Sequence, residues 1–388
     1  MQYRTIGKIG EKKSILGFGC MRLPLTDPSN PESVDYEQAS VMLHEAIEAG
    51  VNYVDTAYNY HSIGGRLGPG QSEPFVGRAL KGGFRERVSV ATKLPIWLVE
   101  KHEDMDRFLN HQLQRLQIEQ IDYYLVHNIN SDVWEPAQRN GVFDFLDRVR
   151  KDGRVRHVGF SFHDRYELFE EVMDAYDWEF AQIQFNYLDV NYQAGLRGLK
   201  RAAGRDLGVV IMEPLRGGFL TNYLPREQAD LLASIRPEWS LAEWALRWIW
   251  HHPEVKVVLS GMSHMDQVMD NLAAADKAEG LTDEELAALT KVRKFFQERL
   301  KINCTSCGYC LPCPEGVCIP KCFAHFNNYY LMDAEEVRAR TKFFYGSQLA
   351  ASEKADKCVG CGRCEERCPQ HLPISELMTE VKSLFHGA

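Results

Sequence analysis

Cysteine is concentrated at one end of this 388-residue chain, where ten of its eleven cysteines follow residue 303. Eight of them form two runs in which neighbouring thiols are separated by two residues, or by three before the last thiol of the second run, and a proline follows the last cysteine of each run. Thiolates at this spacing are typical metal ligands, and three of them can hold three corners of an iron–sulfur cubane. The runs are Cys304, Cys307, Cys310 and Cys313, and Cys358, Cys361, Cys364 and Cys368.

The second run matches the bacterial ferredoxin signature, in which the cysteine before proline binds the other cluster of a pair. This resemblance implies a 4Fe–4S cluster on Cys304, Cys307, Cys310 and Cys368 and another on Cys358, Cys361, Cys364 and Cys313. The first run departs from the signature, because two residues rather than three separate Cys310 from Cys313. Cys318 and Cys322 lie nearby, and either could replace Cys313 as a ligand or be a spare thiol.

Other interpretations of the cysteines are disulfides, zinc or a single cluster. The chain opens without a basic segment followed by an apolar one, so we expect it in the reducing cytoplasm, where disulfides are rare. Zinc sites usually combine two couples of cysteines, whereas a triple run ending in Cys-Pro favours iron. We therefore expect two 4Fe–4S clusters and keep one cluster and zinc as alternatives.

A second group of reactive side chains lies before residue 130. Asp55, Lys93 and His127 each close a short apolar run, and Tyr60 follows Asp55 by five residues. A tyrosine ordinarily titrates near a pKa of about 10, but a neighbouring ammonium favours its phenolate and lowers that pKa. A carboxylate would keep the lysine charged, and a histidine could orient a carbonyl oxygen. This set suits protonation of an oxygen while a hydride reaches its carbon.

Elements that would position these side chains alternate between strand and helix. Eight apolar runs rich in Val, Ile, Tyr and Phe predict strands, which favours a parallel sheet closed into a (β/α)8 TIM barrel. A doubly wound sheet would need a G-x-G-x-x-G fingerprint after the first strand, and Gly17-Phe18-Gly19 does not continue into one. The expected strands are Leu16–Cys20, Asn52–Asp55, Val88–Lys93, Ile121–His127, Val155–Ser161, Ala181–Phe185, Gly208–Glu213 and Lys256–Ser260.

Amphipathic stretches between these runs predict helices, and Tyr3–Ile15 reads as a hairpin that plugs the barrel bottom. A last helix over Leu281–Leu300 has Thr282 as its cap and Glu285 three residues later. In the tail, Asp333–Lys354 should be helical, with a break at Tyr345-Gly346. The other expected helices are Tyr36–Ala49, Asp104–Leu116, Phe143–Lys151, Asp164–Tyr176, Leu241–His251 and Met265–Ala275.

Residues 1–300 resemble an aldo-keto reductase, followed by a ferredoxin-like, α-rich domain over 301–388. The resemblance lies in Asp55-Thr56-Ala57-x-x-Tyr60, Ala91-Thr92-Lys93 and Leu125-Val126-His127. It implies an enzyme that uses NAD(P)H, with Tyr60 as the acid and base. Lys93 and Asp55 would tune this tyrosine, and His127 would orient the carbonyl.

The resemblance also implies a nucleotide site. Ser161 matches the serine that holds the nicotinamide carboxamide, although Phe162 stands where the family often has Asn, and Gln184 matches the glutamine beneath the ring. Relatives that prefer NADPH carry an arginine where Gln267 stands, so we doubt that preference here. The implied cofactor residues are Ser161, Gln184, Met212, Glu213, Leu215, Gly217, Ser260, Gly261, Met262, Gln267 and Asn271.

Three functions follow as hypotheses. The first is an oxidoreductase acting on an aldehyde, ketone or alcohol, with clusters that couple to a partner such as a flavoprotein or ferredoxin. The second is an electron-transfer protein whose barrel only binds nucleotide. The third gives the clusters a structural or sensing role.

Composition and the candidate pocket limit the classes of molecule that this protein could bind. A net charge of −9 argues against nucleic acid, and no apolar run is long enough for a membrane span. Apolar residues after strand ends suggest an aldehyde, ketone or ring rather than a highly charged substrate. Gly64–Gln71, with four glycines, should form a mobile loop over the mouth. Cys20 should be an inert core thiol. The candidate pocket residues are Met21, Tyr58, Trp97, Asn128 and Phe162.

Overall fold

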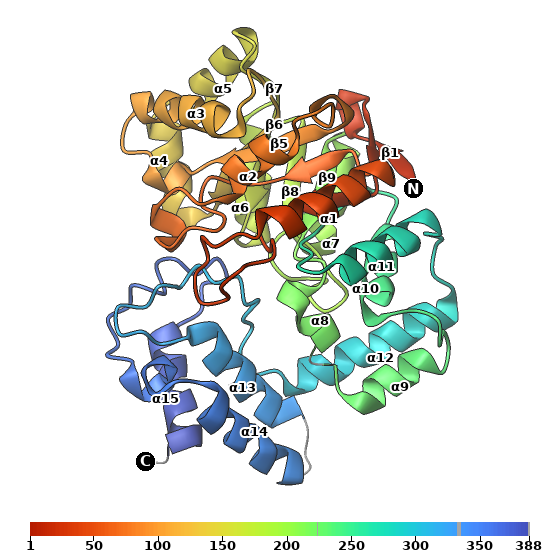
Figure 1. Ribbon diagram of the computed structural model, residues 1–388, viewed down its shortest axis with the longest axis vertical. Coiled ribbons are helices and arrows are strands. Elements are labelled where there is room, and N and C mark those ends of the chain that lie inside the picture. The colour runs from red at the N-terminus through yellow and green to blue at the C-terminus, as the bar shows by residue number, and fades with distance from the viewer. Residues whose placement is uncertain (223, 332–334, 387–388) are drawn as a thin grey trace. The chain divides into compact units, whose positions relative to one another are not determined.

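The structure is a computed structural model that describes residues 1–222, 224–331 and 335–386. Its main feature is a closed barrel of eight parallel strands that follow chain order, with the last strand pairing with the first (Figure 1). The barrel confirms the predicted fold, and the strand ends agree with prediction to within two residues. The strands are β3 (Leu16–Gly19), β4 (Tyr53–Asp55), β5 (Ser89–Leu94), β6 (Ile121–Ile129), β7 (Val155–Phe162), β8 (Phe180–Gln184), β9 (Gly208–Met212) and β10 (Val255–Ser260).

A hairpin closes the bottom of the barrel, as predicted. Its strands β1 (Tyr3–Thr5) and β2 (Lys12–Ser14) pair antiparallel, and the fully buried Ile6 between them packs into the apolar barrel core. Gly208 at the start of β9 makes room for it, because a Cβ there would lie 2.3 Å from Ile6 Cγ2. The close approach of these two residues explains why a glycine begins this strand.

Seven helices lie where the sequence predicts them. Thr282 and Glu285 form the expected capping box of the last one, in which each side chain bonds the other residue's backbone N–H. The seven are α1 (Tyr36–Glu48), α3 (His102–Leu116), α5 (Val142–Lys151), α6 (Tyr166–Ala175), α10 (Leu241–Trp250), α11 (Met265–Asp276) and α12 (Asp283–Arg299).

Five further helices among the described residues before 240 were not predicted. Pro136 lies inside one of them, and another contains Gly195, Gly198 and Gly204, residues that disfavour helix when packing is ignored. Gly198 is needed for packing, because a Cβ there would lie 2.7 Å from Ala194 Cβ. The five are α2 (Ser72–Ala79), α4 (Ser131–Arg139), α7 (Gly195–Gly204), α8 (Phe219–Asn222) and α9 (Arg226–Ala233).

Short 3-10 turns join several of these elements. They are η1 (Gly7–Ile9), η2 (Gly65–Leu67), η3 (Arg85–Arg87), η4 (Ile96–Leu98), η5 (Arg216–Gly218), η6 (Ala351–Glu353) and η7 (Ala355–Lys357).

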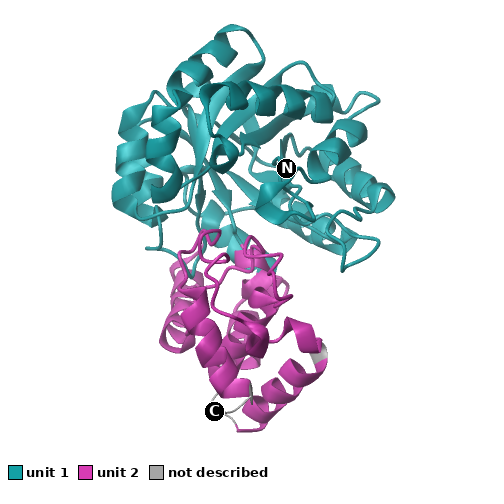
Figure 2. Cartoon of the chain, turned by 90° about the vertical axis from the view of Figure 1, so that its left-hand side faces the viewer, with its two compact units in different colours: residues 1–214, 242–280 teal, residues 215–241, 281–388 magenta. Residues whose placement is uncertain are grey.

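Packing divides the chain into two compact units (Figure 2). The first comprises residues 1–214 and 242–280 and contains the barrel; the second comprises residues 215–241 and 281–388. The two units follow from contacts within the fold, and their bounds differ from those of the domains expected from the sequence. The domain boundaries 1–300 and 301–388 therefore stay a prediction.

The second unit has its own core, built on α13 (Ile319–Leu331), α14 (Glu335–Gln348) and α15 (Ile374–His386). The predicted break at Tyr345-Gly346 is wrong, because α14 runs through both residues; the predicted start at Asp333 lies outside the described residues. Tyr345 is buried and Gly346 is exposed, a position where glycine costs a helix only about 1 kcal/mol. The core includes Ile302, Cys310, Phe323, Phe326, Tyr345, Ile374, Met378 and Val381.

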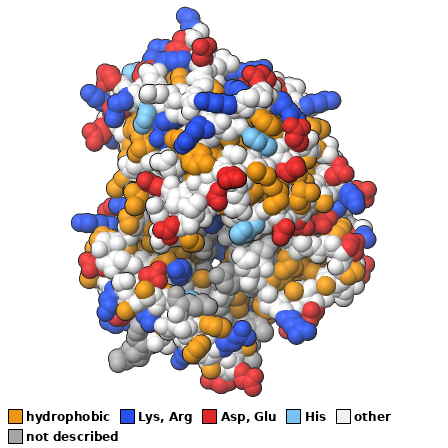
Figure 3. Space-filling model, viewed as in Figure 1, with side chains coloured by type: hydrophobic (Ala, Val, Ile, Leu, Met, Phe, Trp, Pro, Cys, Tyr) orange, Lys and Arg blue, Asp and Glu red, His pale blue; other side chains and the backbone are white. Residues whose placement is uncertain are grey.

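The surface carries both signs of charge, and acidic and basic side chains are interspersed on the face in Figure 3. Across the described residues, no helix combines the length and the apolar character that a membrane crossing requires.

Candidate functional site

The residues predicted for catalysis share one layer of the barrel interior. Alternate strand residues point inward, and inward residues such as Tyr53 and Leu125 form the apolar core at the bottom. Two residues further along each strand, the inward side chains become polar and reach the carboxyl-end mouth. This polar layer comprises Asp55 of β4, Lys93 of β5, His127 of β6 and Ser161 of β7.

Lys93 and Asp55 form a buried ion pair. Lys93 Nζ lies 2.7 and 2.8 Å from the two carboxylate oxygens of Asp55 and also donates to the Thr56 carbonyl at 2.8 Å. Burial lowers the pKa of Lys93 and raises the pKa of Asp55, and each partner opposes the shift of the other. Because three acceptors surround the ammonium, the charged pair is the form that this geometry favours.

The same ammonium faces Tyr60. Lys93 Nζ lies 3.4 Å from the Tyr60 hydroxyl oxygen, and only 7% of Tyr60 is exposed. The structure therefore brings together the predicted acid and its two predicted tuning residues, although Lys93 is 33 positions from Tyr60 and 38 from Asp55 in the sequence.

His127 completes the group with a neutral imidazole. Its ring lies edge-on to the Tyr60 ring, with centroids 6.1 Å apart. Burial and then the positive charges of Lys93 and Arg66 hold the pKa of His127 well below its ordinary value of 6.5. Nδ1 of this ring is buried without a hydrogen-bond partner among the described residues. A neutral imidazole can donate one N–H to a carbonyl oxygen.

A polar network outside the barrel holds the strand that carries Lys93. Glu73 of α2 is fully buried and accepts hydrogen bonds from Thr92, Gln112 and Arg115. Gln112 of α3 also donates to the Lys93 carbonyl at 2.9 Å. These bonds fix the end of β5, which limits the positions that Lys93 can take.

Side chains at the predicted nucleotide site include buried groups that lack partners among the described residues. The Asn128 backbone N–H donates to Ser161 Oγ at 2.7 Å, and neither polar atom of the Asn128 carboxamide has a partner among the described residues. Gln182 Oε1 is similarly unsatisfied, and Gln182 is the neighbour of Ser161 in the β7–β8 ladder. Unsatisfied buried amides are costly, so these groups fit a ligand that brings donors and acceptors.

Gln184, the glutamine that the resemblance indicated, has a protein partner instead. Its Nε2 donates to Asp189 at 2.9 Å, whereas Gln182 Nε2 lies 3.4 Å from Met212 Sδ. Both glutamines share the inward face of β8 because they are two residues apart. Gln182 is thus a candidate that the sequence reasoning missed, and the period-two spacing was the available signal.

The segment after β9 turns sharply. Glu213, Arg216 and Gly217 all have positive φ, of 54°, 50° and 67°, and the last two begin η5. Met212 and Glu213 belong to the first unit, and Leu215 and Gly217 to the second. Because the chain turns here instead of continuing as a strand, its backbone N–H groups lie outside the sheet ladder. A loop that binds phosphate oxygens needs such N–H groups.

Residues at the end of β10 form a second polar loop. Asn271 donates to Ser260 Oγ at 2.8 Å, and Gln267 accepts from the Ser263 N–H at 2.8 Å. Arg22 follows β3 and lies beside Gly261, where a Cβ would be 3.3 Å from the Arg22 side chain. A cation from the opposite end of the chain therefore stands next to a loop in which the sequence showed none. Met262, which follows Gly261 in this loop, is buried.

The predicted pocket residues separate in the structure. Trp97 lies against His127, with ring centroids 5.0 Å apart, and Asn128 follows on the same strand. Phe162 and Tyr58 instead pack outward, on Phe169 of α6 and Phe108 of α3. Strand alternation explains Phe162, since its neighbour Ser161 points inward. Met21 is half-buried after β3, and Cys20 is fully buried, which raises the pKa of its thiol as expected for an inert residue.

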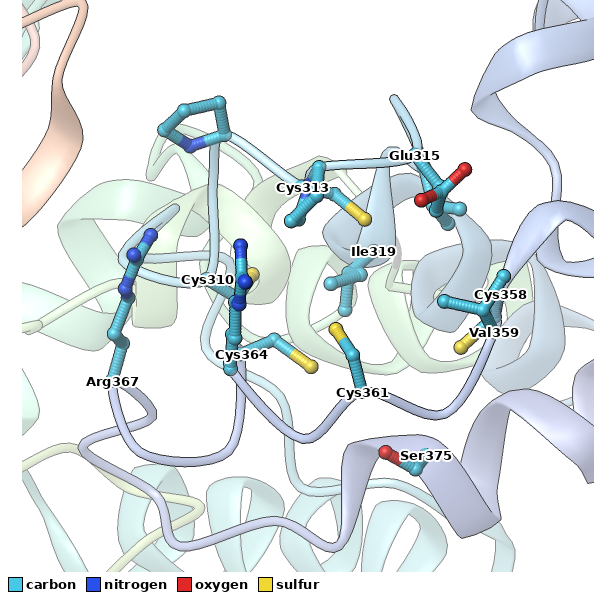
Figure 4. Close-up of a pocket in the computed structure, with 14 residues that line it drawn as sticks. Cys310, Cys313, Glu315, Ile319, Cys358, Val359, Cys361, Cys364, Arg367 and Ser375 are labelled. Carbon is cyan, nitrogen blue, oxygen red and sulfur yellow. The ribbon is translucent and has the colours of Figure 1, made fainter.

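In the second unit, five cysteines line one cavity. They are Cys310, Cys313, Cys358, Cys361 and Cys364, and the Sγ atoms of Cys313, Cys361 and Cys364 point toward its centre (Figure 4). Cys304, Cys307 and Cys368 surround Cys310 closely enough to raise the pKa of its thiol, after the larger effect of burial. Cys310 also lines the cavity, and Cys364 contributes to the same pKa shift, so the two predicted ligand sets adjoin at Cys310.

The extra cysteines lie elsewhere. Cys322 is fully buried, and its thiol contacts the Glu353 carbonyl at 3.4 Å; the Cys318 N–H donates to the same oxygen at 2.9 Å. Neither lines the cavity in Figure 4. Over residues 1–222, 224–331 and 335–386, no three Cys, His, Asp or Glu side chains converge tightly enough for a single metal ion.

Comparison with known proteins decides the family. The aldo/keto reductase family model matches residues 15–294, and a 4Fe-4S dicluster domain matches residues 303–372. This chain is an aldo/keto reductase. It therefore belongs to a family of oxidoreductases and carries a 4Fe–4S domain at its C-terminal end.

Similar proteins cover the barrel. An uncharacterized oxidoreductase of Bacillus subtilis, YqkF, is 26% identical over 322 residues, which span 74% of this chain and 95% of the relative. L-galactose dehydrogenase of Arabidopsis thaliana is 26% identical over 300 residues, spanning 72% and 90%. The holo structure of aldo-keto reductase AKR11C1 from Bacillus halodurans matches with a TM-score of 0.61 and 27% identity, covering 75% of this chain and 96% of that one.

Proposed function

We propose that this aldo/keto reductase uses NAD(P)H to reduce the carbonyl of an aldehyde or ketone, or NAD(P)+ to oxidise the alcohol. The observation that carries the proposal is the Lys93 ammonium, which lies 3.4 Å from the Tyr60 hydroxyl while Asp55 holds it from behind. Burying an ammonium beside a phenol costs desolvation free energy, so stability alone does not explain this arrangement. It suits a tyrosine that gives and regains a proton.

In reduction, Tyr60 donates its proton to the carbonyl oxygen, and Lys93 stabilises the phenolate that forms. Asp55 keeps Lys93 charged and aimed. His127 stays neutral and donates a hydrogen bond to the same oxygen, so it orients the substrate without competing for the proton. When bound, the nicotinamide supplies the hydride in reduction or accepts it in oxidation.

A nicotinamide carboxamide fits the polar groups beside this site. Ser161, Asn128 and Gln182 offer hydroxyl and amide groups, and the described structure leaves the Asn128 side chain and Gln182 Oε1 unsatisfied. Asn128 thus offers a carboxamide although Phe162 follows Ser161 in the sequence. The rest of the nucleotide would lie along Met212 and Glu213 and the loop from Ser260 to Asn271. Arg22 weakens the sequence argument against NADPH, because it supplies a cation beside Gly261.

The tail, in this proposal, holds two 4Fe–4S clusters. Cys313, Cys358, Cys361 and Cys364 would bind one through the cavity that they line, and Cys304, Cys307, Cys310 and Cys368 the other. When bound, the clusters supply one-electron chemistry. Cys361 and Val359 are exposed, and 65% of Val359 is accessible, which favours electron exchange with a partner such as a flavoprotein or ferredoxin over a purely structural role. The proposal places the protein in the cytoplasm.

The test is an anaerobic preparation with iron and sulfide counted, followed by aldehydes and ketones with NADH and NADPH in turn. We expect nicotinamide absorbance to fall with at least one carbonyl and one nucleotide. Loss of the visible cluster absorbance on adding NADH and a flavoprotein reductase would indicate electron exchange. No turnover with any carbonyl, together with cluster reduction, would replace this proposal by the electron-transfer alternative.

A further inference from the structure

Cys322 is an extra cysteine whose thiol is fully buried and still takes part in hydrogen bonds. The thiol donates to the Glu353 carbonyl at 3.4 Å, and the Cys318 N–H donates to the same oxygen at 2.9 Å. Burial raises the pKa of Cys322 to about 12, so at neutral pH this sulfur carries a proton to donate. The start of α13 therefore holds the Glu353 carbonyl with two donors.

Tyr345 holds the same segment from α14. The Ala355 N–H donates to the Tyr345 hydroxyl oxygen at 2.9 Å, and both residues are buried. A hydrogen bond also joins the side chains of Tyr345 and Cys322. The Tyr345 ring stacks on Phe385 of α15, with ring centroids 4.0 Å apart. One hydroxyl therefore links the thiol of α13 to the backbone that follows η6.

This backbone leads directly to Cys358, the first thiol of its run. The Cys358 N–H donates to the Ala355 carbonyl at 3.1 Å, across the turn η7. Ala355 thus bonds Tyr345 through its N–H and Cys358 through its carbonyl. Because Cys358 lines the cavity in Figure 4, a shift of Ala355 would move a thiol that faces the predicted cluster.

The loop after Cys358 depends on contacts at its two ends. Gly360 and Gly362 have positive φ, of 68° and 74°, and apart from chain neighbours no atom of the described residues lies within 4 Å of a Cβ built at either. At the far end, Glu365 accepts a hydrogen bond from the Ser375 N–H of α15 at 2.6 Å. Packing leaves the middle of the loop open, so the hydrogen bonds at its ends must set its position.

We propose that Cys322 and Tyr345 position Cys358 as a ligand of the cavity cluster, the 4Fe–4S cluster assigned to the cavity in Figure 4. The inference rests on the proposed function for the presence of that cluster. Neither residue lines the cavity, so both act through the backbone from Glu353 to Ala355. Removing groups that orient metal ligands from behind commonly weakens metal binding by about tenfold or more. Cys322 therefore has a role other than that of ligand or spare thiol.

Removal of the tyrosine hydroxyl tests this chain of hydrogen bonds. Tyr345→Phe keeps a ring against Phe385 but takes the acceptor from the Ala355 N–H. In anaerobically prepared full-length protein, the cavity cluster should lose iron to a ferrous chelator about tenfold faster than in wild type. Its electron paramagnetic resonance signal, identified as the one that Cys361→Ser removes, should also shift. Tyr330→Phe on α13 is the matched control, because that hydroxyl makes no hydrogen bond to the described residues.

Cysteine variants answer the same question without changing the tyrosine. Cys322→Ala removes the thiol donor to Glu353 and should speed the loss of iron from the cavity cluster. Cys322→Ser should restore retention at least in part, because a hydroxyl can both donate and accept. Cys318→Ala is the control, since its bond to Glu353 comes from a backbone N–H that the substitution keeps. If Tyr345→Phe is insoluble, this set of variants decides the question alone.

The second cluster separates positioning from a general loss of folding. Its signal and its iron should stay as in wild type while those of the cavity cluster change. Equal loss from both clusters without rescue by Cys322→Ser would overturn the inference, and so would wild-type retention in Tyr345→Phe and Cys322→Ala. A wild type whose iron content and spectrum do not change in Cys361→Ser would reject the cavity cluster of the proposed function, and this inference with it, before any other variant is compared.

Discussion

At the scale of single residues, the mouth of the barrel depends on neutral and charged groups held at fixed positions. Lys93 and Asp55 are charged because they bond each other, while His127 is neutral because burial and neighbouring cations disfavour its charged form.

His127 predicts acid sensitivity. Its pKa is depressed in the folded chain, so below its ordinary value of 6.5 the unfolded chain binds a proton that the folded chain does not. Stability should therefore fall as the pH drops from 6.5 towards about 5. Urea unfolding of His127→Gln should show a shallower decline over this range than wild type, whereas the exposed His264→Gln should follow wild type. Parallel declines for His127→Gln and wild type would show that His127 is protonated when folded.

Sequence reasoning found the residues that follow from strand order but not those placed by packing. Asp55, Lys93 and His127 could be found because each ends an inward-facing strand. Arg66, Arg22 and Glu73 act from loops and helices, and no spacing in the sequence links them to their partners. The prediction that Phe162 lines the pocket is wrong, because side chains alternate along β7 and Phe162 therefore points away from the barrel interior that Ser161 faces.

At the scale of elements, the barrel depends on what fills its closed end. Periodicity predicted all eight strands, because each combines apolar residues with a clear boundary. It missed α4 and α7, which contain proline or glycine and are stabilised by contacts that a local pattern does not show.

The hairpin makes a prediction about stability. Ile6→Ala would leave a cavity beneath Tyr53 and Phe180 and should cost about 2–5 kcal/mol of barrel stability. Tryptophan fluorescence in urea measures it well, since six of the seven tryptophans lie in the first unit. Val41→Ala, at a side chain that is 54% exposed on α1, should change stability by no more than about 0.5 kcal/mol. Equal effects of the two variants would mean that the hairpin does not plug the barrel.

At the scale of the whole molecule, one chain joins a barrel suited to hydride chemistry with a tail suited to single electrons. The family match covers the barrel, and the dicluster match covers the tail. Ligand spacing predicted the two sets of cysteines, but it left Cys313, Cys318 and Cys322 as alternatives because spacing alone does not show which thiols share a cavity.

The cavity makes that choice testable. Cys313→Ser should lower the iron and sulfide content of anaerobically prepared protein and change the electron paramagnetic resonance spectrum of one cluster. Cys318→Ser should retain both, because Cys318 lies beside Glu353 rather than in the cavity. Full iron in Cys313→Ser and loss in Cys318→Ser would reverse the assignment.

The most direct test of the account is the turnover of Tyr60→Phe. Removing this hydroxyl should lower kcat for a reducible aldehyde by about 10²-fold or more, while the affinity for nucleotide stays unchanged, because only the proton donor is lost. Tyr53→Phe is the matched control: it removes a buried hydroxyl that has no partner among the described residues, at the other end of the barrel, and should keep kcat. A Tyr60→Phe enzyme that turns over like wild type would contradict the account.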